Sequence, residues 1–136
     1  MAYDPYVPVE KNIDETQKIL EDKLGFGKSF DVGQREIVVM ERRIQLYYIT
    51  GLVDSELVVD LMTQLLLLNS LPHPNDDVFQ TIHNRLVHQQ VTVTDKVNDI
   101  CTSVLSGLVA IIVDKETQAF VVDVRSYPGR GPSEPD

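Results

Sequence analysis

The three histidines of this chain are the residues whose chemistry could mark a metal site. His83 and His88 are separated by five positions, a spacing that does not bring two side chains onto one helix face, and His73 lies in a proline-flanked loop. No carboxylate pair completes a ligand set at these positions. We therefore expect no metal site, and we expect His88 to make a structural hydrogen bond where a helix meets a strand.

Cys101 is the single cysteine, which excludes an internal disulfide bond and a cysteine-based zinc site. It falls on the apolar side of an expected helix, where a small buried hydrophobe is the simplest interpretation. A nucleophile would need an activating base and some exposure, and the sequence indicates neither. The 21 acidic residues are scattered over helix starts and turns. The sequence thus predicts no catalytic residue, no cofactor and no enzymatic activity.

A glycine-rich segment near the end of the chain contains the residues that we expect to make contacts. Pro128-Gly129 favours a turn, and Gly129-Arg130-Gly131 lacks the spacing and the lysine of a phosphate-binding loop. A sharp exit from the sheet is the favoured interpretation. Arginine side chains in this acidic chain are strong forked donors for a partner or a following domain. The candidate partner or interdomain contacts are Arg125, Tyr127, Pro128, Gly129, Arg130 and Gly131.

The length and composition are those of one globular domain with a core. The chain has 136 residues, of which 43% are hydrophobic and 24% are charged. Its net charge of −9 argues against nucleic acid as a partner, because phosphate binding needs basic patches. The same charge argues against docking of the domain body on an anionic membrane. No apolar run is long enough for a membrane span, so we expect a soluble chain.

Hydrophobic periodicity predicts an α/β (α+β) fold, with a mixed sheet of about five strands and about four helices packed on it. Asn12, Asp54 or Ser55, and Thr94 are the expected helix caps. A tight turn is expected near Glu41-Arg42 and a hairpin loop at Asp114–Gln118. The expected helices cover 13–24, 56–68, 77–87 and 95–106, and the expected strands cover 35–40, 43–50, 89–93, 108–113 and 119–124.

Three segments are expected along the chain: an extended N-terminal segment over 1–11, a single α/β domain over 12–126, and an exit loop over 127–136 that leads toward a missing following domain. The Tyr47-Tyr48 pair and the leucine run 65–68 are expected in the core. The alternative is that these side chains form an interface, which would follow if the chain has more apolar surface than one domain can bury.

Several segments together resemble the soluble N-terminal region of A subunits of the GerA family, the bacterial spore germination receptors. The most specific of them is RSYPGRGPSEPD at 125–136. The supporting segments are FDVGQREI at 30–37, QLYYITGLVDSE at 45–56, RLVHQQVTVTD at 85–95 and LSGLVAIIVD at 105–114.

The resemblance implies a non-enzymatic interaction or regulatory domain of a multi-pass membrane protein. Such a domain would lie on the cytosolic (spore core) face of the spore inner membrane and take part in receptor assembly, signalling or ion release. The implied partners are other germination-protein subunits, the membrane domain of the same chain, and a second copy in a homo-oligomer. The alternative is a small-molecule sensor for a nutrient germinant, with a pocket between helices and sheet.

Overall fold

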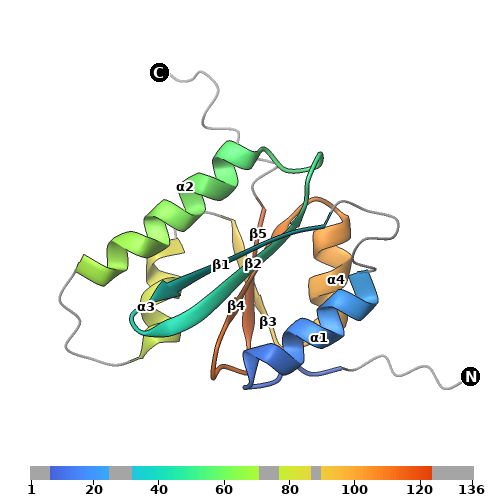
Figure 1. Ribbon diagram of the computed structural model, residues 1–136, viewed down its shortest axis with the longest axis horizontal. Coiled ribbons are helices and arrows are strands. Elements are labelled where there is room, and N and C mark those ends of the chain that lie inside the picture. Colours follow the sequence, from blue (N-terminus) through green and yellow to red (C-terminus); the bar gives the residue numbers. More distant parts are fainter. Residues whose placement is uncertain (1–6, 25–31, 71–76, 87–89, 124–136) are drawn as a thin grey trace, which may run out of the picture.

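The computed structural model describes residues 7–24, 32–70, 77–86 and 90–123 (Figure 1). Five strands form one sheet in the order β1-β2-β4-β5-β3. The strands are β1 (Val32–Val39), β2 (Arg42–Ile49), β3 (Val91–Thr94), β4 (Val109–Val113) and β5 (Ala119–Val122). The expected five-stranded α+β fold is confirmed. All four neighbouring pairs are antiparallel, so the sheet is not mixed, because it is assembled from two hairpins and one short edge strand.

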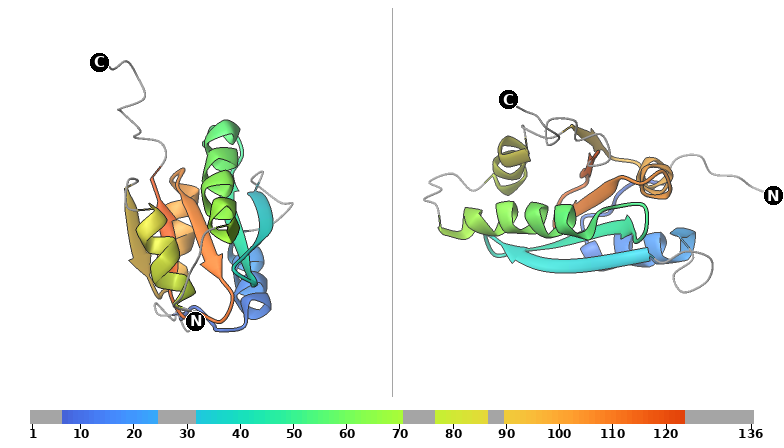
Figure 2. Two further views of the ribbon diagram at one scale, coloured as in Figure 1. Left: turned by 90° about the vertical axis from the view of Figure 1, so that its left-hand side faces the viewer. Right: turned by 90° about the horizontal axis from the view of Figure 1, so that it is seen from above.

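Helices cover both faces of this sheet (Figures 1 and 2). They are α1 (Ile13–Leu24), α2 (Ser55–Leu66), α3 (Val78–Arg85) and α4 (Val97–Leu105), and the short 3-10 helix η1 (Leu67–Ser70) extends α2. Figure 1 shows α2 and α3 on one side of the sheet and α1 and α4 on the other. The chain is therefore a three-layer sandwich of helices, sheet and helices.

Alternation along the central strands explains why the sheet needs cover on both faces. Ile44, Leu46 and Tyr48 of β2 point into the core under α2 and α3, whereas Tyr47 and Ile49 point into the core under α1 and α4. Every residue of β4 and β5 is buried. The central strands are therefore covered on both faces.

Side-chain caps explain where α1 and α2 begin, whereas α4 begins without one. Asn12 Oδ1 accepts a hydrogen bond from the Asp14 N–H at 2.9 Å, and Asp54 Oδ1 accepts one from the Glu56 N–H at 2.9 Å. The prediction of Thr94 as a helix cap was wrong: α4 begins at Val97 with Lys96 in the cap position. Thr94 Oγ1 instead accepts a hydrogen bond from the Lys96 N–H at 3.1 Å, which ends β3 and leads the chain into the helix.

The β1-β2 hairpin turns at Met40 and Glu41, one residue before the expected position. Both residues have positive φ angles, 53° and 67°, which a type I′ turn requires but non-glycine residues rarely adopt. Arg42 is already paired with Val39, so β2 begins there. This one-residue difference decides which side chains of β1 and β2 lie opposite each other.

Candidate functional site

The residues predicted as contacts, Arg125 to Gly131, lie outside the described residues and remain a prediction. His73 and His88 lie outside them too. His83 belongs to α3, where its ring stacks on Phe120 of β5 with centroids 5.7 Å apart. Phe79 stacks on the same ring with centroids 4.3 Å apart. His83 is thus part of the packing of α3 on the sheet.

Cys101 lies on α4 and is buried in the core under α1 and α4. Burial raises the pKa of its thiol to about 11, and the charge of Lys23 opposes that rise. A thiol with this pKa is almost fully protonated near neutral pH, which agrees with its interpretation as a small hydrophobe. Among residues 7–24, 32–70, 77–86 and 90–123, no group of three or more His, Cys, Asp or Glu side chains gathers as a metal site would require.

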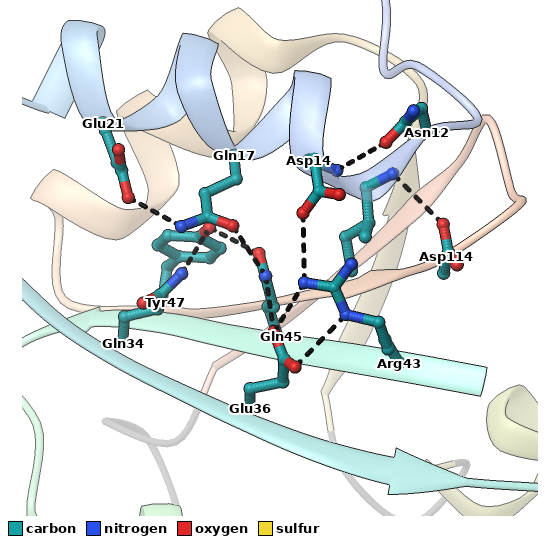
Figure 3. Close-up of polar contacts among 11 residues, drawn as sticks. Asn12, Asp14, Gln17, Glu21, Gln34, Glu36, Arg43, Gln45, Tyr47 and Asp114 are labelled. Atoms are coloured by element: carbon teal, nitrogen blue, oxygen red, sulfur yellow. Dashed lines mark hydrogen bonds and ion pairs between the residues drawn. The ribbon is translucent and has the colours of Figure 1, made fainter. Parts of the chain in front are cut away.

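Figure 3 shows a layer of hydrogen-bonded polar side chains between α1 and the β1-β2 hairpin. Gln45 is buried at its centre. Its Nε2 donates to Gln17 Oε1 and to Glu36 Oε1, both at 2.9 Å, and its Oε1 accepts from the Tyr47 hydroxyl at 2.6 Å. Gln34 Nε2 donates to the same tyrosine hydroxyl at 3.0 Å. A buried amide with this many partners is satisfied and fixes the position of α1.

Arg43 closes the polar layer at the start of α1. Its Nη2 lies 3.0 Å from Asp14 Oδ1 and 3.1 Å from Glu36 Oε1, and its Nε donates to Glu36 Oε2 at 3.2 Å. Hydrogen bonds from Arg43 and from Gln45 hold the pKa of Glu36 below its usual range. The fork of the guanidinium therefore binds one carboxylate from the sheet and one from the helix.

Burial raises the pKa of Tyr47 above its usual range. The tyrosine stays protonated at physiological pH and donates its hydroxyl proton to Gln45. The polar groups of this layer therefore bind one another, and their hydrogen bonds hold α1 on the sheet. It is an interaction between elements of one domain and offers no reacting pair.

Sequence reasoning did not identify this layer. Gln34 and Glu36 alternate along β1 and lie opposite Tyr47 and Gln45 of β2. The alternation of polar residues along one strand was the signal that could have revealed it.

A second feature is the outer face of α2. Val59, Leu66 and Leu67 are 47%, 42% and 48% exposed, whereas Leu65 and Leu68 are buried in the core. The leucine run 65–68 was expected in the core, and that prediction is wrong for its two middle residues because a helix turns them outward. Tyr47 and Tyr48 are both buried, as expected.

Within the described part of the chain, no helix combines the length and hydropathy that crossing a bilayer requires.

A third feature is a cavity of about 290 Å³ between α4 and the strands β3 and β5. It is open to solvent, and its lining combines hydroxyl-bearing side chains and the carboxylate of Asp99 with the apolar side chains of Val93, Leu108 and Val121.

Comparison with known proteins places this fold in a family. The sequence model of one protein family, the Bacillus/Clostridium GerA spore germination proteins, matches residues 18–136 of this chain. The chain is 38% identical over 130 residues to stage V sporulation protein AF of Bacillus subtilis (strain 168), covering 96% of this chain and 26% of that protein. It thus spans about a quarter of the length of this relative.

The fold also matches a crystal structure, that of the N-terminal domain of the A subunit of the Bacillus megaterium spore germinant receptor GerK3. The TM-score is 0.74 at 20% identity, over 89% of this chain and 49% of that chain. At this identity the match bears on the fold alone. The resemblance noted in the sequence is confirmed by the family match and by the identity to the sporulation protein. The chain belongs to the GerA family of Bacillus/Clostridium spore germination proteins.

Proposed function

We propose that this chain is a non-enzymatic interaction domain of a multi-pass membrane protein of spore germination. In this proposal the domain lies on the cytosolic face of the spore inner membrane and contributes to receptor assembly, signalling or ion release. Membership of the GerA family supports the germination role. The chain spans 26% of the length of the sporulation protein, which supports the proposal that it is one domain of a longer polypeptide.

The exposed apolar side chains of α2 carry the proposal of an interaction role. Val58, Leu61 and Leu65 fill the core under this helix, and Val59, Leu66 and Leu67 point the other way. Val59 and Leu66 are two turns apart on the same side, so the outer apolar residues form a row and not a scatter. Asp60 and Gln64, which are exposed and polar, lie beside this row, so the apolar side chains form a narrow strip along one flank of α2 for a partner to cover.

The partner that fits this row is an apolar surface of another germination-protein subunit or of the membrane-bound part of the same polypeptide. Leu66 and Leu67 lie at the junction of α2 and η1, so a partner seated on the row would also touch the end of the β1-β2 hairpin through Asn69. Binding there would act on the sheet through a hydrogen-bonded contact, which suits a regulatory domain.

The experiment is site-specific photo-crosslinking in the full-length protein in sporulating cells. A photoreactive amino acid at Leu66 should form a crosslink to a germination-protein subunit or to another part of its own polypeptide. Leu105 is the matched control, because it is a leucine exposed to 41% on α4, on the opposite side of the sheet. Equal crosslinking at both positions, or none at Leu66 in a protein that is present and folded, would exclude α2 as the interaction surface.

A double variant tests whether the exposed apolar row of α2 is needed for germination. Leu66→Gln with Leu67→Gln should slow germination of spores while leaving the thermal unfolding of the 136-residue chain nearly unchanged, since both side chains are exposed. Leu105→Gln should leave germination unaffected. Normal germination with the double variant would contradict the proposal.

A further inference from the structure

The outer edge of β1 is an open edge of the sheet. β1 stands at one end of the strand order and pairs with β2 on its inner side. The two-residue turn of the hairpin makes Val39 and Arg42 a hydrogen-bonded pair, so every second residue back along β1 turns its backbone toward β2. The residues between them, which include Gln34 and Glu36, turn their N–H and C=O groups away from β2.

Contacts near the turn agree with this alternation and limit the length of the open edge. The Val38 carbonyl points away from β2, because it accepts the hydrogen bond from Asn69 Nδ2 at 3.0 Å. The backbone groups of Gln34 and Glu36 point the same way and bond to no other residue of the described ranges. Asn69 thus occupies the edge beside the turn and leaves 32–37 as a template for a further strand.

Little in the sequence of this stretch blocks such pairing. Proline, which natural sheets use to protect an edge, does not occur in 32–37. Charged side chains can also protect an edge, but both of those present here are bound to β2. Arg43 holds the carboxylate of Glu36, and Arg35 Nε donates to the Tyr48 hydroxyl at 3.0 Å. These side chains therefore lie along the faces of the sheet and leave its edge accessible.

The side chains on the face toward α2 determine which strand would fit. The ring of Tyr48 lies against Gly33, since a Cβ added there would be 2.5 Å from the ring's Cζ. An aromatic residue opposite a strand glycine covers such a position. Arg35 is exposed and takes part in no salt bridge within the described ranges, so a carboxylate opposite it would gain a partner. An apolar residue suits the partly buried Ile37.

A second copy of β1 does not offer these residues. In an antiparallel pair that continues the sheet, opposite residues point to the same face. The residues of β1 that share the face toward α2 are Gly33, Arg35, Ile37 and Val39. None of them is a carboxylate, because Glu36 points to the other face, toward α1 (Figure 3). The strand that fits this edge therefore has a different sequence.

We propose that the outer edge of β1 binds an extended segment of a partner protein as an added antiparallel strand. Every second residue of this segment faces α2: an apolar residue opposite Ile37, an acidic residue opposite Arg35 and an aromatic residue opposite Gly33. Its backbone bonds to the N–H and C=O groups of Gln34 and Glu36. This docking edge is distinct from the exposed apolar row of α2, so the test of either surface can fail while the other succeeds.

The test is an amide-resolved NMR titration of the 136-residue chain with the capped peptide acetyl-Val-Thr-Glu-Thr-Phe-Thr-amide, which has the proposed order. A short strand in one open edge should bind with a Kd on the order of 1 mM. We expect saturable shifts and slower hydrogen exchange at the amides of Gln34 and Glu36. The amides of Arg35 and Ile37 already face β2 and should gain much less protection from exchange.

N-methylated peptides show whether the backbone of the peptide forms the bonds. The peptide's threonine opposite Gln34 turns its N–H toward β1, whereas its glutamate turns its N–H away. N-methylation of this threonine should weaken binding at least about 10-fold. N-methylation of the glutamate is the matched control and should change the Kd by less than about 2-fold.

A charge exchange tests the register. Arg35→Glu should weaken binding of the peptide about 5-fold and should make the chain prefer a peptide with lysine in place of glutamate. Arg85→Glu is the matched control, because it makes the same change on α3 and should leave the preference for the glutamate peptide unaltered.

Three outcomes would overturn the proposal. Saturable shifts away from β1 would assign the peptide to another surface. Equal losses of affinity for the two N-methylated peptides would show that the peptide does not bind as an added strand. Shifts along β1 that depend on the concentration of the protein, with no peptide present, would identify a second copy as the occupant of the edge.

Discussion

The side chain of Asn69 binds the two peptide groups that flank Val39, where β1 enters the turn of the β1-β2 hairpin. Asn69 Oδ1 accepts a hydrogen bond from the Met40 N–H at 2.7 Å, and Asn69 Nδ2 donates to the Val38 carbonyl at 3.0 Å. Met40 and Glu41 both have positive φ angles. One amide at the end of η1 therefore holds a strained turn from a segment 29 residues away.

Asn69→Ala should lower the free energy of unfolding by about 1–2 kcal/mol, because two hydrogen bonds to the turn are lost together. Urea denaturation followed by circular dichroism measures the change. Asn84→Ala on α3 is the control: Asn84 is also exposed and accepts one side-chain bond, from Gln80, so its loss should cost less than about 0.5 kcal/mol. Equal effects of the two variants would show that Asn69 does not support the turn.

Gly33→Ala should destabilise the domain by about 1–3 kcal/mol through overpacking. A Cβ added at Gly33 would clash with Cε2 of the Tyr48 ring and lie 2.5 Å from its Cζ. The ring cannot easily move, because the Tyr48 hydroxyl accepts a hydrogen bond from Arg35 Nε at 3.0 Å. Combining Gly33→Ala with Tyr48→Leu should remove most of this additional cost. A double variant whose losses simply add would rule out the clash as the cause.

Stability should fall in acid partly through Glu36. Its pKa in the folded protein lies below the ordinary value of 4.5, chiefly because Arg43 hydrogen-bonds the carboxylate. A lowered folded-state pKa contributes stability that is present above the unfolded pKa and is lost as pH falls through the folded pKa.

Glu36→Gln should therefore be less stable than the wild type at pH 7, and the difference should shrink as pH falls below 4.5. Urea midpoints measured from pH 7 to pH 3 provide the test. The pH-dependent part of the difference should become smaller in an Arg43→Gln background, where only the hydrogen bond from Gln45 still lowers the pKa of Glu36. A gap that stays constant across this range would show that the carboxylate charge is not the origin.

Cys101 should react with Ellman's reagent at pH 8 at least about 100-fold more slowly in the folded chain than in urea, because its pKa is raised to about 11 and its side chain is buried. The rate should rise with urea in parallel with unfolding measured by circular dichroism. Fast labelling without denaturant would mean that α4 opens readily from α1.

The sequence predicted the elements well where local chemistry decides them. The first helix was expected over 13–24 and is α1, because Asn12 caps it and apolar residues recur at helical spacing. Both hairpins were expected, and the fourth helix ends close to its expected bound, just before Gly107, whose φ is 101°. In contrast, the start of α4 was placed early, since Thr94 looks like a cap in the sequence but binds the Lys96 N–H at the end of a strand.

What could not be predicted depends on register and packing. The turn at Met40-Glu41 contains neither glycine nor asparagine, so nothing in the sequence located it to the residue. The pairing of Glu36 with Gln45 follows from that turn, and the polar layer follows from that pairing. The open pocket between α4 and the strands β3 and β5 combines residues that are far apart in the sequence, and only the packing of the helix on the sheet brings them together.

The central pair of the sheet joins two strands that the ribosome makes far apart in time. β2 (Arg42–Ile49) pairs with β4 (Val109–Val113), and α2, α3, β3 and α4 are synthesised between them. Until β4 emerges, the inner edge of β2 has open backbone groups and apolar side chains on both faces. The sheet of the nascent chain is therefore completed late, when the β4-β5 hairpin docks between β2 and β3, and this non-local step is the one expected to limit the folding rate.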